Sequence, residues 1–547
     1  MAYYIIEAFN SGLDLRRARE VTAPGALRVL RNAYITSGGE IRKRKAFVEI
    51  ERLSDYCNLA NYKGKVTGPH ALPGQNLDVF FVHRHNSLPG LSDGFIAGAG
   101  PISAYTLLPA AQAYLGAFAT KLTTALTSYE GMMCATSVAH FADGVYLVEE
   151  YLKTPVSGFF PVRRDHTDFG TQYELDEPTT ATAVTTNDDR EFQIMLGNKG
   201  YVVDDDTFYI SAVGDPSNMT GTGSGSVNVS SNGRPVGPLV ACGDYFGDLV
   251  LFGRRGAQFY SVSSDPAATQ YNRSVMLSLV APRSVVNYGS GDILYLARDG
   301  IRSLQARDSS NFAQVSDVGS PIDRLIQQEL EYSATEAEAM LGTSTEYADA
   351  QFFRLAKGIV HSETGQYWLA LKDKIYVLSR HPAAKVLAWS TYDLPTPAAG
   401  NINSDAGTRK SGWMADACQV GNTVIFRNFA DEVYLYGGLD LDEYDESEVE
   451  IITPYMDMGT PEDYKHFTGI SMVCFGTWTV QVSTTVTDDT DTYDWETVAT
   501  ITNQTRTLGR IAFQTYGQQI AIRLTSTSAV PALIAQISIM YEKSSAK

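Results

Sequence analysis

A short unit recurs along the middle of the chain, between about residues 77 and 437. It consists of a turn with Gly or Asp, four or five mostly apolar residues, a second polar turn and another apolar run. Four copies are clear, and their first apolar runs are residues 249–252, 293–296, 367–371 and 423–426. Weaker copies lie near 77–81, 143–148 and 192–210. Two apolar runs joined by a tight turn predict a β-hairpin.

An isolated hairpin is only marginally stable in water, so several hairpins in one chain need to pack together. Radial packing would protect their edges and predicts a β-propeller, here with five to seven blades. Unrelated hairpins distributed over two sandwiches are the alternative. The 31 Tyr and 23 Phe residues agree with a mainly β chain, because aromatic residues favour half-buried pleated surfaces. We therefore expect a mainly β fold, namely a propeller of hairpin blades with a C-terminal β-sandwich and short helical insertions.

The pattern predicts three parts along the chain. Residues 1–60 form an N-terminal segment with the first strands and assembly contacts, 61–438 form the propeller, and 439–547 form the C-terminal sandwich. Insertions are expected at about 100–135 and 316–345. In the second insertion Ser320, Pro321 and Asp323 resemble a helix start. Six strands are expected in the sandwich, at 470–475, 477–484, 495–501, 511–515, 519–525 and 534–541.

Charge is distributed unevenly along the chain. The net charge is −19, and residues 439–547 hold 16 Asp and Glu against 6 Lys and Arg, whereas residues 1–50 carry a net +4. An acidic surface repels phosphates, which argues against tight nucleic-acid binding but suits a conduit for nucleic acid. The densest acidic stretch is a candidate channel or interface segment, and its carboxylates are Asp440, Asp442, Glu443, Asp445, Glu446, Glu448 and Glu450.

Motifs for catalysis or cofactor binding are missing from the sequence. It has no Gly-x-Ser-x-Gly, Walker or His-Glu-x-x-His pattern, and its five cysteines are too scattered for a zinc site or a disulfide framework. His83 and His85 could share a strand face as a metal pair. Asp204–Asp206 and Asp440–Glu450 could be calcium loops, but solvated turns are the simpler interpretation of both. We expect no enzyme activity, no cofactor, no bound metal, no secretory signal and no membrane-spanning segment.

Three stretches resemble a known family when they are taken in order. They are 31–44 with its Arg31-Asn32-Ala33-Tyr34 and Gly38-Gly39-Glu40-Ile41-Arg42-Lys43-Arg44, the hairpin 243–262, and the C-terminal 508–542. Together they are similar to the packaged-DNA stabilisation proteins of short-tailed phages (podoviruses), also called tail hub or nozzle proteins. The stretch 86–129 does not align with that pattern.

The resemblance implies a structural virion protein of the phage tail, assembled in the host cytoplasm. Such proteins form a homohexamer below the portal–adaptor ring, around the channel through which duplex DNA passes without specific binding. They retain packaged DNA, connect head to tail for genome ejection, and carry the distal tail needle, tailspike or fibre proteins. They offer no catalytic residues. A propeller-type glycan hydrolase and a glycan-binding attachment protein are the alternative functions.

Overall fold

The computed structural model of this chain is mainly β. It describes residues 2–18, 22–23, 25–52, 66–71, 78–85, 94–101, 117–120, 133–141, 144–151, 158–164, 173–175, 190–204, 206–215, 218–231, 236–237, 239–253, 255–289, 291–309, 317–330, 356–397, 412–430, 432–484 and 493–543. For the strands between 78 and 175 only the backbone is described.

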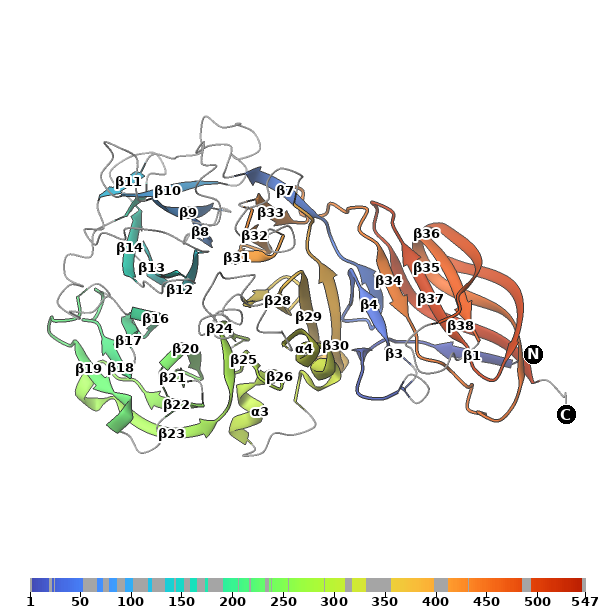
Figure 1. The fold of residues 1–547 in the computed structure, drawn as a ribbon, viewed down its shortest axis with the longest axis horizontal. Coiled ribbons are helices and arrows are strands. Elements are labelled where there is room, and N and C mark those ends of the chain that lie inside the picture. The colour runs from blue at the N-terminus through green and yellow to red at the C-terminus, as the bar shows by residue number, and fades with distance from the viewer. Residues whose placement is uncertain are drawn as a thin grey trace, which may run out of the picture.

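Small antiparallel sheets follow one another along the chain (Figure 1). The first sheet contains β8 (Val66–Ala71), β9 (Asp78–His85), β10 (Gly94–Pro101) and β11 (Ala117–Thr120). The second contains β12 (Met133–Phe141), β13 (Gly144–Tyr151), β14 (Gly158–Arg164) and β15 (Tyr173–Leu175). The third contains β16 (Arg190–Leu196), β17 (Lys199–Asp204), β18 (Thr207–Ile210) and β19 (Gly225–Asn228). The fourth contains β20 (Leu239–Tyr245), β21 (Asp248–Gly253), β22 (Gly256–Ser261) and β23 (Gln270–Met276). The fifth contains β24 (Leu279–Asn287), β25 (Ile293–Ala297) and β26 (Gly300–Ser303).

Two further four-stranded units complete the series. One contains β27 (Lys357–His361), β28 (Gln366–Leu371), β29 (Lys374–His381) and β30 (Val386–Asp393). The other contains β31 (Met414–Val420), β32 (Thr423–Asn428), β33 (Glu432–Tyr436) and β7 (Phe47–Arg52), so a strand from the N-terminal region finishes a sheet formed near residue 430. Among the described residues no sheet closes on itself into a barrel.

The first strands of these seven units contact one another in sequence. β8 contacts β12, and the contacts continue through β16, β20, β24, β27 and β31, which contacts β8 again. Figure 1 shows the units arranged around a common centre. Aromatic side chains pack between neighbouring units, such as Phe208 against Tyr260 at 5.1 Å and Phe252 against Tyr295 at 5.8 Å between ring centroids. Apolar faces of adjacent sheets therefore bury each other, as the hairpin argument requires.

All four clear hairpin predictions are confirmed. They correspond to β21–β22, β25–β26, β28–β29 and β32–β33, each an antiparallel pair. The hairpin pattern did not reveal the strand that precedes each pair, although β20, β24, β27 and β31 are the strands that contact the neighbouring units. The turn that joins each of these strands to its hairpin is the Gly-containing turn that opens the recurring unit, such as Gly247 and Gly421, so the pattern marked the turn but not the strand before it.

The remaining strands form the C-terminal part, which is continuous with β27–β30 through β4. These strands are β1 (Ala2–Ile6), β2 (Gly12–Leu13), β3 (Ala26–Leu27), β4 (Val29–Arg31), β5 (Ala33–Ile35), β6 (Ile41–Lys43), β34 (Val449–Ile452), β35 (Lys465–Ser483), β36 (Glu496–Gly517), β37 (Ala521–Ser526) and β38 (Leu533–Lys543). β35 is the central strand of this part and forms a long hairpin with β36. One end of β35 pairs with β38 and the other with β37.

Two of the predicted strand breaks are wrong. The runs 470–475 and 477–484 belong, except for residue 484, to the single strand β35, and 495–501 and 511–515 belong, except for residue 495, to β36. Gly476 has φ +90° and the pairing register shifts there, so the chain forms a bulge without leaving the sheet. Gly476 thus marks a bulge inside one strand, where the sequence pattern predicted a break between two strands.

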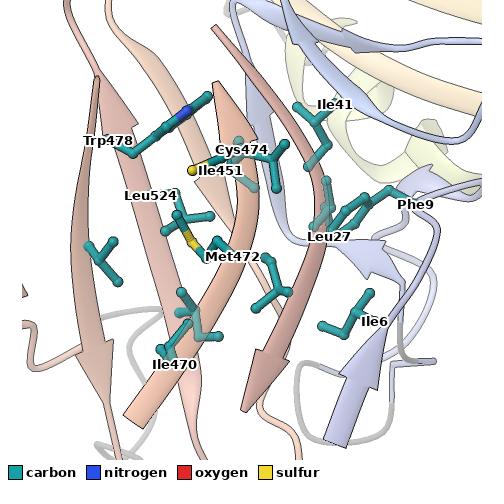
Figure 2. Close-up of a cluster of buried hydrophobic side chains, with 14 of the residues drawn as sticks. Ile6, Phe9, Leu27, Ile41, Ile451, Ile470, Met472, Cys474, Trp478 and Leu524 are labelled. Atoms are coloured by element: carbon teal, nitrogen blue, oxygen red, sulfur yellow. The ribbon is translucent and has the colours of Figure 1, made fainter. Parts of the chain in front are cut away.

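The N-terminal residues complete the C-terminal core. Ile6, Phe9, Leu27 and Ile41 are buried in one cluster with residues of the long hairpin and its neighbours, including Ile470, Met472, Cys474, Trp478, Ile451 and Leu524 (Figure 2). The predicted segment 1–60 is therefore divided between this core, to which residues 6–41 contribute, and the sheet that β7 completes.

Helices are few and short among the described residues. They are α3 (Leu304–Ser309), α4 (Asp323–Leu330) and the 3-10 turns η2 (Val229–Ser231), η3 (Pro266–Ala268), η4 (Ser320–Ile322) and η6 (Pro382–Ala384). The predicted helix near residue 320 is confirmed, but it begins as a 3-10 turn with Gly319 as N-cap, so the expected cap, Ser320, lies inside it. Residues 331–355 and most of 100–135 lie outside the described residues.

Candidate functional site

The acidic segment 440–450 connects β33 to β34 and so joins the ring of small sheets to the C-terminal part. Gly437 and Gly438 come just before it with φ of +84° and +63°, and a Cβ on Gly438 would lie 2.1 Å from Glu443 Oε1. Glycine therefore allows the chain to turn back here. The segment is held against the N-terminal region, because Ala46 N donates to the carbonyl of Glu443 at 2.7 Å.

Cationic side chains from β4, β6 and the residue after β6 face this segment. Arg31 forms ion pairs with Glu448 and with Glu450, the second at 3.4 Å, and Glu450 is also paired with Arg523 at 2.6 Å. Arg44, whose side chain is only 4% exposed, pairs with Asp445 at 2.9 Å. Burial opposes ionisation of Asp445, but Arg44 and hydrogen bonds from Ser447 outweigh it, so the pKa of this carboxyl lies below its ordinary value.

Lys43 fixes the same segment through backbone carbonyls. Its Nζ is buried and donates to the carbonyls of Asp445, Ser447 and Ser528 at 2.7, 3.0 and 2.8 Å. Burial lowers the pKa of Lys43 to about 8, and the nearby carboxylate of Asp445 opposes this shift. An ammonium group has three donors, and here each of them has an acceptor.

We call the contacts of Arg31, Lys43 and Arg44 with the acidic segment the joint. Asn32 connects this joint to the ring of small sheets. It has φ +54° and is buried. Its Nδ2 donates to Asp393 Oδ2 and to the carbonyl of Glu448, both at 2.8 Å, and its Oδ1 accepts from Arg44 Nε and the Asp393 backbone N. Asparagine tolerates a left-handed backbone better than most residues, and its short amide can bond on both sides at once.

Three of the seven predicted carboxylates remain exposed, namely Asp440, Asp442 and Glu446. Glu443 is half-buried and accepts from the backbone N of Leu439 at 3.1 Å. The structure thus brings Asp445, Glu448 and Glu450 together with cations of the N-terminal region, and leaves the other three at the surface.

The sequence prediction missed the cationic half of this site. In the sequence, Arg31, Lys43 and Arg44 stand out only as part of the resemblance to a family, and that resemblance assigns these side chains no contact of their own. The opposite net charges of the two chain ends were the available signal, because segments of opposite charge attract each other.

Two buried carboxylates, Asp292 and Asp317, lie on either side of Ser303. Asp292 accepts from Ser303 Oγ at 2.8 Å and from the backbone N of Gln305 at 3.1 Å, and Asp317 accepts from Ser303 N at 3.1 Å. Burial raises the pKa of both carboxyls. They are 4% and 5% exposed and bonded to the backbone around the start of α3, which is a structural arrangement and not an open catalytic pair.

The other predicted sites give no further chemistry. Among the described residues no group of three or more His, Cys, Asp or Glu could hold a metal ion, and no helix there is long and apolar enough to cross a membrane. The side chains of His83 and His85, and Asp205 of the aspartate run, lie outside what the structure describes. Cys242 and Cys474 are free thiols whose pKa burial raises to about 12 and about 11, which favours the protonated thiol at neutral pH.

Comparison with known proteins gives no family. No family model and no curated protein matches the chain. Among solved structures, the extracellular domains of two hybrid two-component systems of B. thetaiotaomicron are 10% and 8% identical, with TM-scores of 0.37 and 0.35. They cover 88% and 78% of this chain, which spans 52% and 42% of theirs.

A glycoside hydrolase family 43 arabinoxylan arabinofuranohydrolase from Bacillus subtilis is 9% identical, covers 90% of this chain and 98% of its own, and has a TM-score of 0.22. Likeness at these scores carries no argument about function.

Proposed function

We propose that the seven units are the blades of a β-propeller and that the protein is a structural hub, or nozzle, of a short-tailed phage tail. The closed order of contacts from β8 through β31 and back to β8 supports a propeller. β7 supports it too, because a strand from the N-terminal region completing the last blade would hold the ring together.

The observation that carries the function is the role of the N-terminal motif. Arg31, Asn32, Lys43 and Arg44, which carry part of the resemblance to tail hub proteins, form the joint between the ring and the C-terminal part. These residues are occupied by structural contacts and not by an open site. A motif that sets the orientation of two parts of a subunit suits an assembly protein.

The proposal includes the assembly that the resemblance implies. Six copies would form a ring below the portal–adaptor, carry the distal tail proteins and let duplex DNA pass. Six chains of net charge −19 would carry −114 and would repel the DNA backbone. The exposed Asp440, Asp442 and Glu446 are the part of the acidic segment that would face the channel or the next subunit.

The mass of the purified protein, alone and with the portal–adaptor complex, tests this proposal. We expect a ring of six on the adaptor, and heads made without the protein should package DNA and then leak it. The triple variant Asp440→Asn, Asp442→Asn, Glu446→Gln should fold but assemble or retain DNA differently. Its control, Asp494→Asn with Glu496→Gln, changes two other exposed carboxylates. A protein that stays monomeric and never joins the adaptor would refute the hub.

A glycan hydrolase or glycan-binding attachment protein is the alternative on the same fold. A hydrolase requires two carboxyl groups roughly 5–10 Å apart that substrate can reach. Release of reducing sugar from a host polysaccharide by a monomeric protein would favour the hydrolase. Retention on immobilised polysaccharide without cleavage would favour the attachment protein.

A further inference from the structure

Arg283 is a buried cation on β24, one of the strands that contact neighbouring units. Its side chain is 1% exposed. Its Nη2 donates to the carbonyl of Ala415 at 2.7 Å and to Asp416 Oδ1 at 3.2 Å. A guanidinium cannot lose its proton in a protein, so this side chain carries a full charge inside the fold.

Asp416 on β31 is the carboxylate that several donors share. Besides Arg283, it pairs with Lys357 Nζ of β27 at 2.9 Å and accepts from the backbone N of Gly68 of β8 at 3.3 Å and of Ala417 at 2.9 Å. One buried group thus connects four strands from four different units. The cluster of these three side chains holds one negative charge, on Asp416, and two positive charges, on Arg283 and Lys357.

The excess positive charge is accompanied by unpaired donors. Within the part of the chain that the structure describes, Nε and Nη1 of Arg283 are buried and have no hydrogen-bond partner. Among the described residues, Asp416 is the only carboxylate within ion-pairing distance of Arg283 or Lys357. Unpaired buried donors on a charged group are costly, and native proteins satisfy nearly all of them.

We infer that Arg283, with Lys357, binds a small monovalent inorganic anion such as chloride where β24, β27, β31 and β8 meet. A water molecule would accept a hydrogen bond but would leave uncompensated the net charge of +1 that the described groups carry. A monovalent anion would accept the hydrogen bonds of Arg283 and would also compensate the positive charge. A larger or doubly charged anion would overcompensate the charge in a buried place, so the site should prefer halides to sulfate or phosphate.

Thermal unfolding in sodium chloride and in sodium gluconate at equal ionic strength tests the site, because gluconate is too bulky for a buried position. We expect the Tm of the full chain to rise saturably with chloride, by roughly a few degrees, and to stay flat with gluconate. Lys357→Met should weaken the chloride effect several-fold. The control Lys372→Met removes a lysine paired with Glu329 elsewhere and should leave it unchanged.

Bromide-soaked crystals give a readout that does not depend on stability or on any variant. An anomalous peak within about 3.5 Å of Arg283 Nε or Nη1 is expected. The inference is overturned if bromide gives no peak there and chloride and gluconate give the same Tm. It is equally overturned if the position holds only a water molecule.

Discussion

His361 lies in an aromatic environment at the start of the β27–β28 turn. It is 1% exposed, stacks on Trp368 with ring centroids 5.4 Å apart, and contacts Thr364 Oγ1 through Nδ1 at 2.5 Å. Burial lowers its pKa from 6.5 to about 4; nearby Glu363 raises the pKa and Lys45 lowers it. The neutral imidazole is therefore the form that the fold accommodates.

This pKa predicts loss of stability in acid. Between pH 6.5 and about 4 the unfolded chain binds a proton that the folded His361 does not, so the contribution is complete above pH 6.5 and is lost as the pH falls towards 4. The free energy of unfolding should fall by roughly 3 kcal/mol more in the wild type than in His361→Gln across this window. Urea titrations at pH 7 and pH 4 measure it. Parallel curves for the two proteins would contradict the prediction.

Lys43 provides a second prediction at the residue scale. Lys43→Met leaves three partly buried carbonyls without their donor and should lower the free energy of unfolding by roughly 2–3 kcal/mol. Lys45→Met is the matched control. It removes one ion pair, with Glu363 at 3.5 Å, and should cost less than about 1 kcal/mol. Equal effects of the two substitutions in denaturant unfolding would mean that the three carbonyl contacts contribute little.

At the scale of elements, the long hairpin depends on its bulge. Gly476 has φ +90°, and a Cβ there would lie 3.0 Å from both Ala532 Cβ and the carbonyl oxygen of Pro531. Gly476→Ala should therefore destabilise the protein by roughly 1–3 kcal/mol. Gly197→Ala is the control, because Gly197 has φ +55° but nothing within 4 Å of its Cβ. A Tm that falls no further for Gly476→Ala than for Gly197→Ala would show that the close approach is relieved without cost.

The joint is also an arrangement of elements. β30, β4 and β34 are neighbours in one sheet, so the ring and the C-terminal part share hydrogen-bonded backbone as well as ion pairs. A shared sheet resists bending more than a flexible linker does. The residues that hold Asp445 and Glu448 in place therefore strengthen a connection that the backbone already makes.

For the whole molecule, the shared core predicts that residues 439–547 do not fold alone. Phe9, Leu27, Leu30 and Ile41 are fully buried against this part, and their removal would expose its apolar interior. The isolated fragment should show no cooperative thermal transition by circular dichroism. A fragment with residues 1–46 fused ahead of it should regain one. Cooperative unfolding of the unfused fragment would refute the prediction.

Sequence patterns sufficed for the features that depend on neighbours along the chain. The hairpins β21–β22, β25–β26, β28–β29 and β32–β33 follow from alternating apolar runs and tight turns, and the start of α4 follows from Pro321 and the apolar spacing after it. In each case the physical cause, turn geometry or helical periodicity, acts over fewer than about ten residues.

The tertiary structure alone decided what depends on distant segments. The acidic residues were visible in the sequence, but only folding places Asp445 and Glu448 beside Arg44 and Arg31, some 400 positions earlier. β7 joins β33, and Arg283 meets Asp416, for the same reason. Charge attraction and apolar burial do not depend on sequence separation, so local patterns predict which residues are charged or buried but not which partner each one meets.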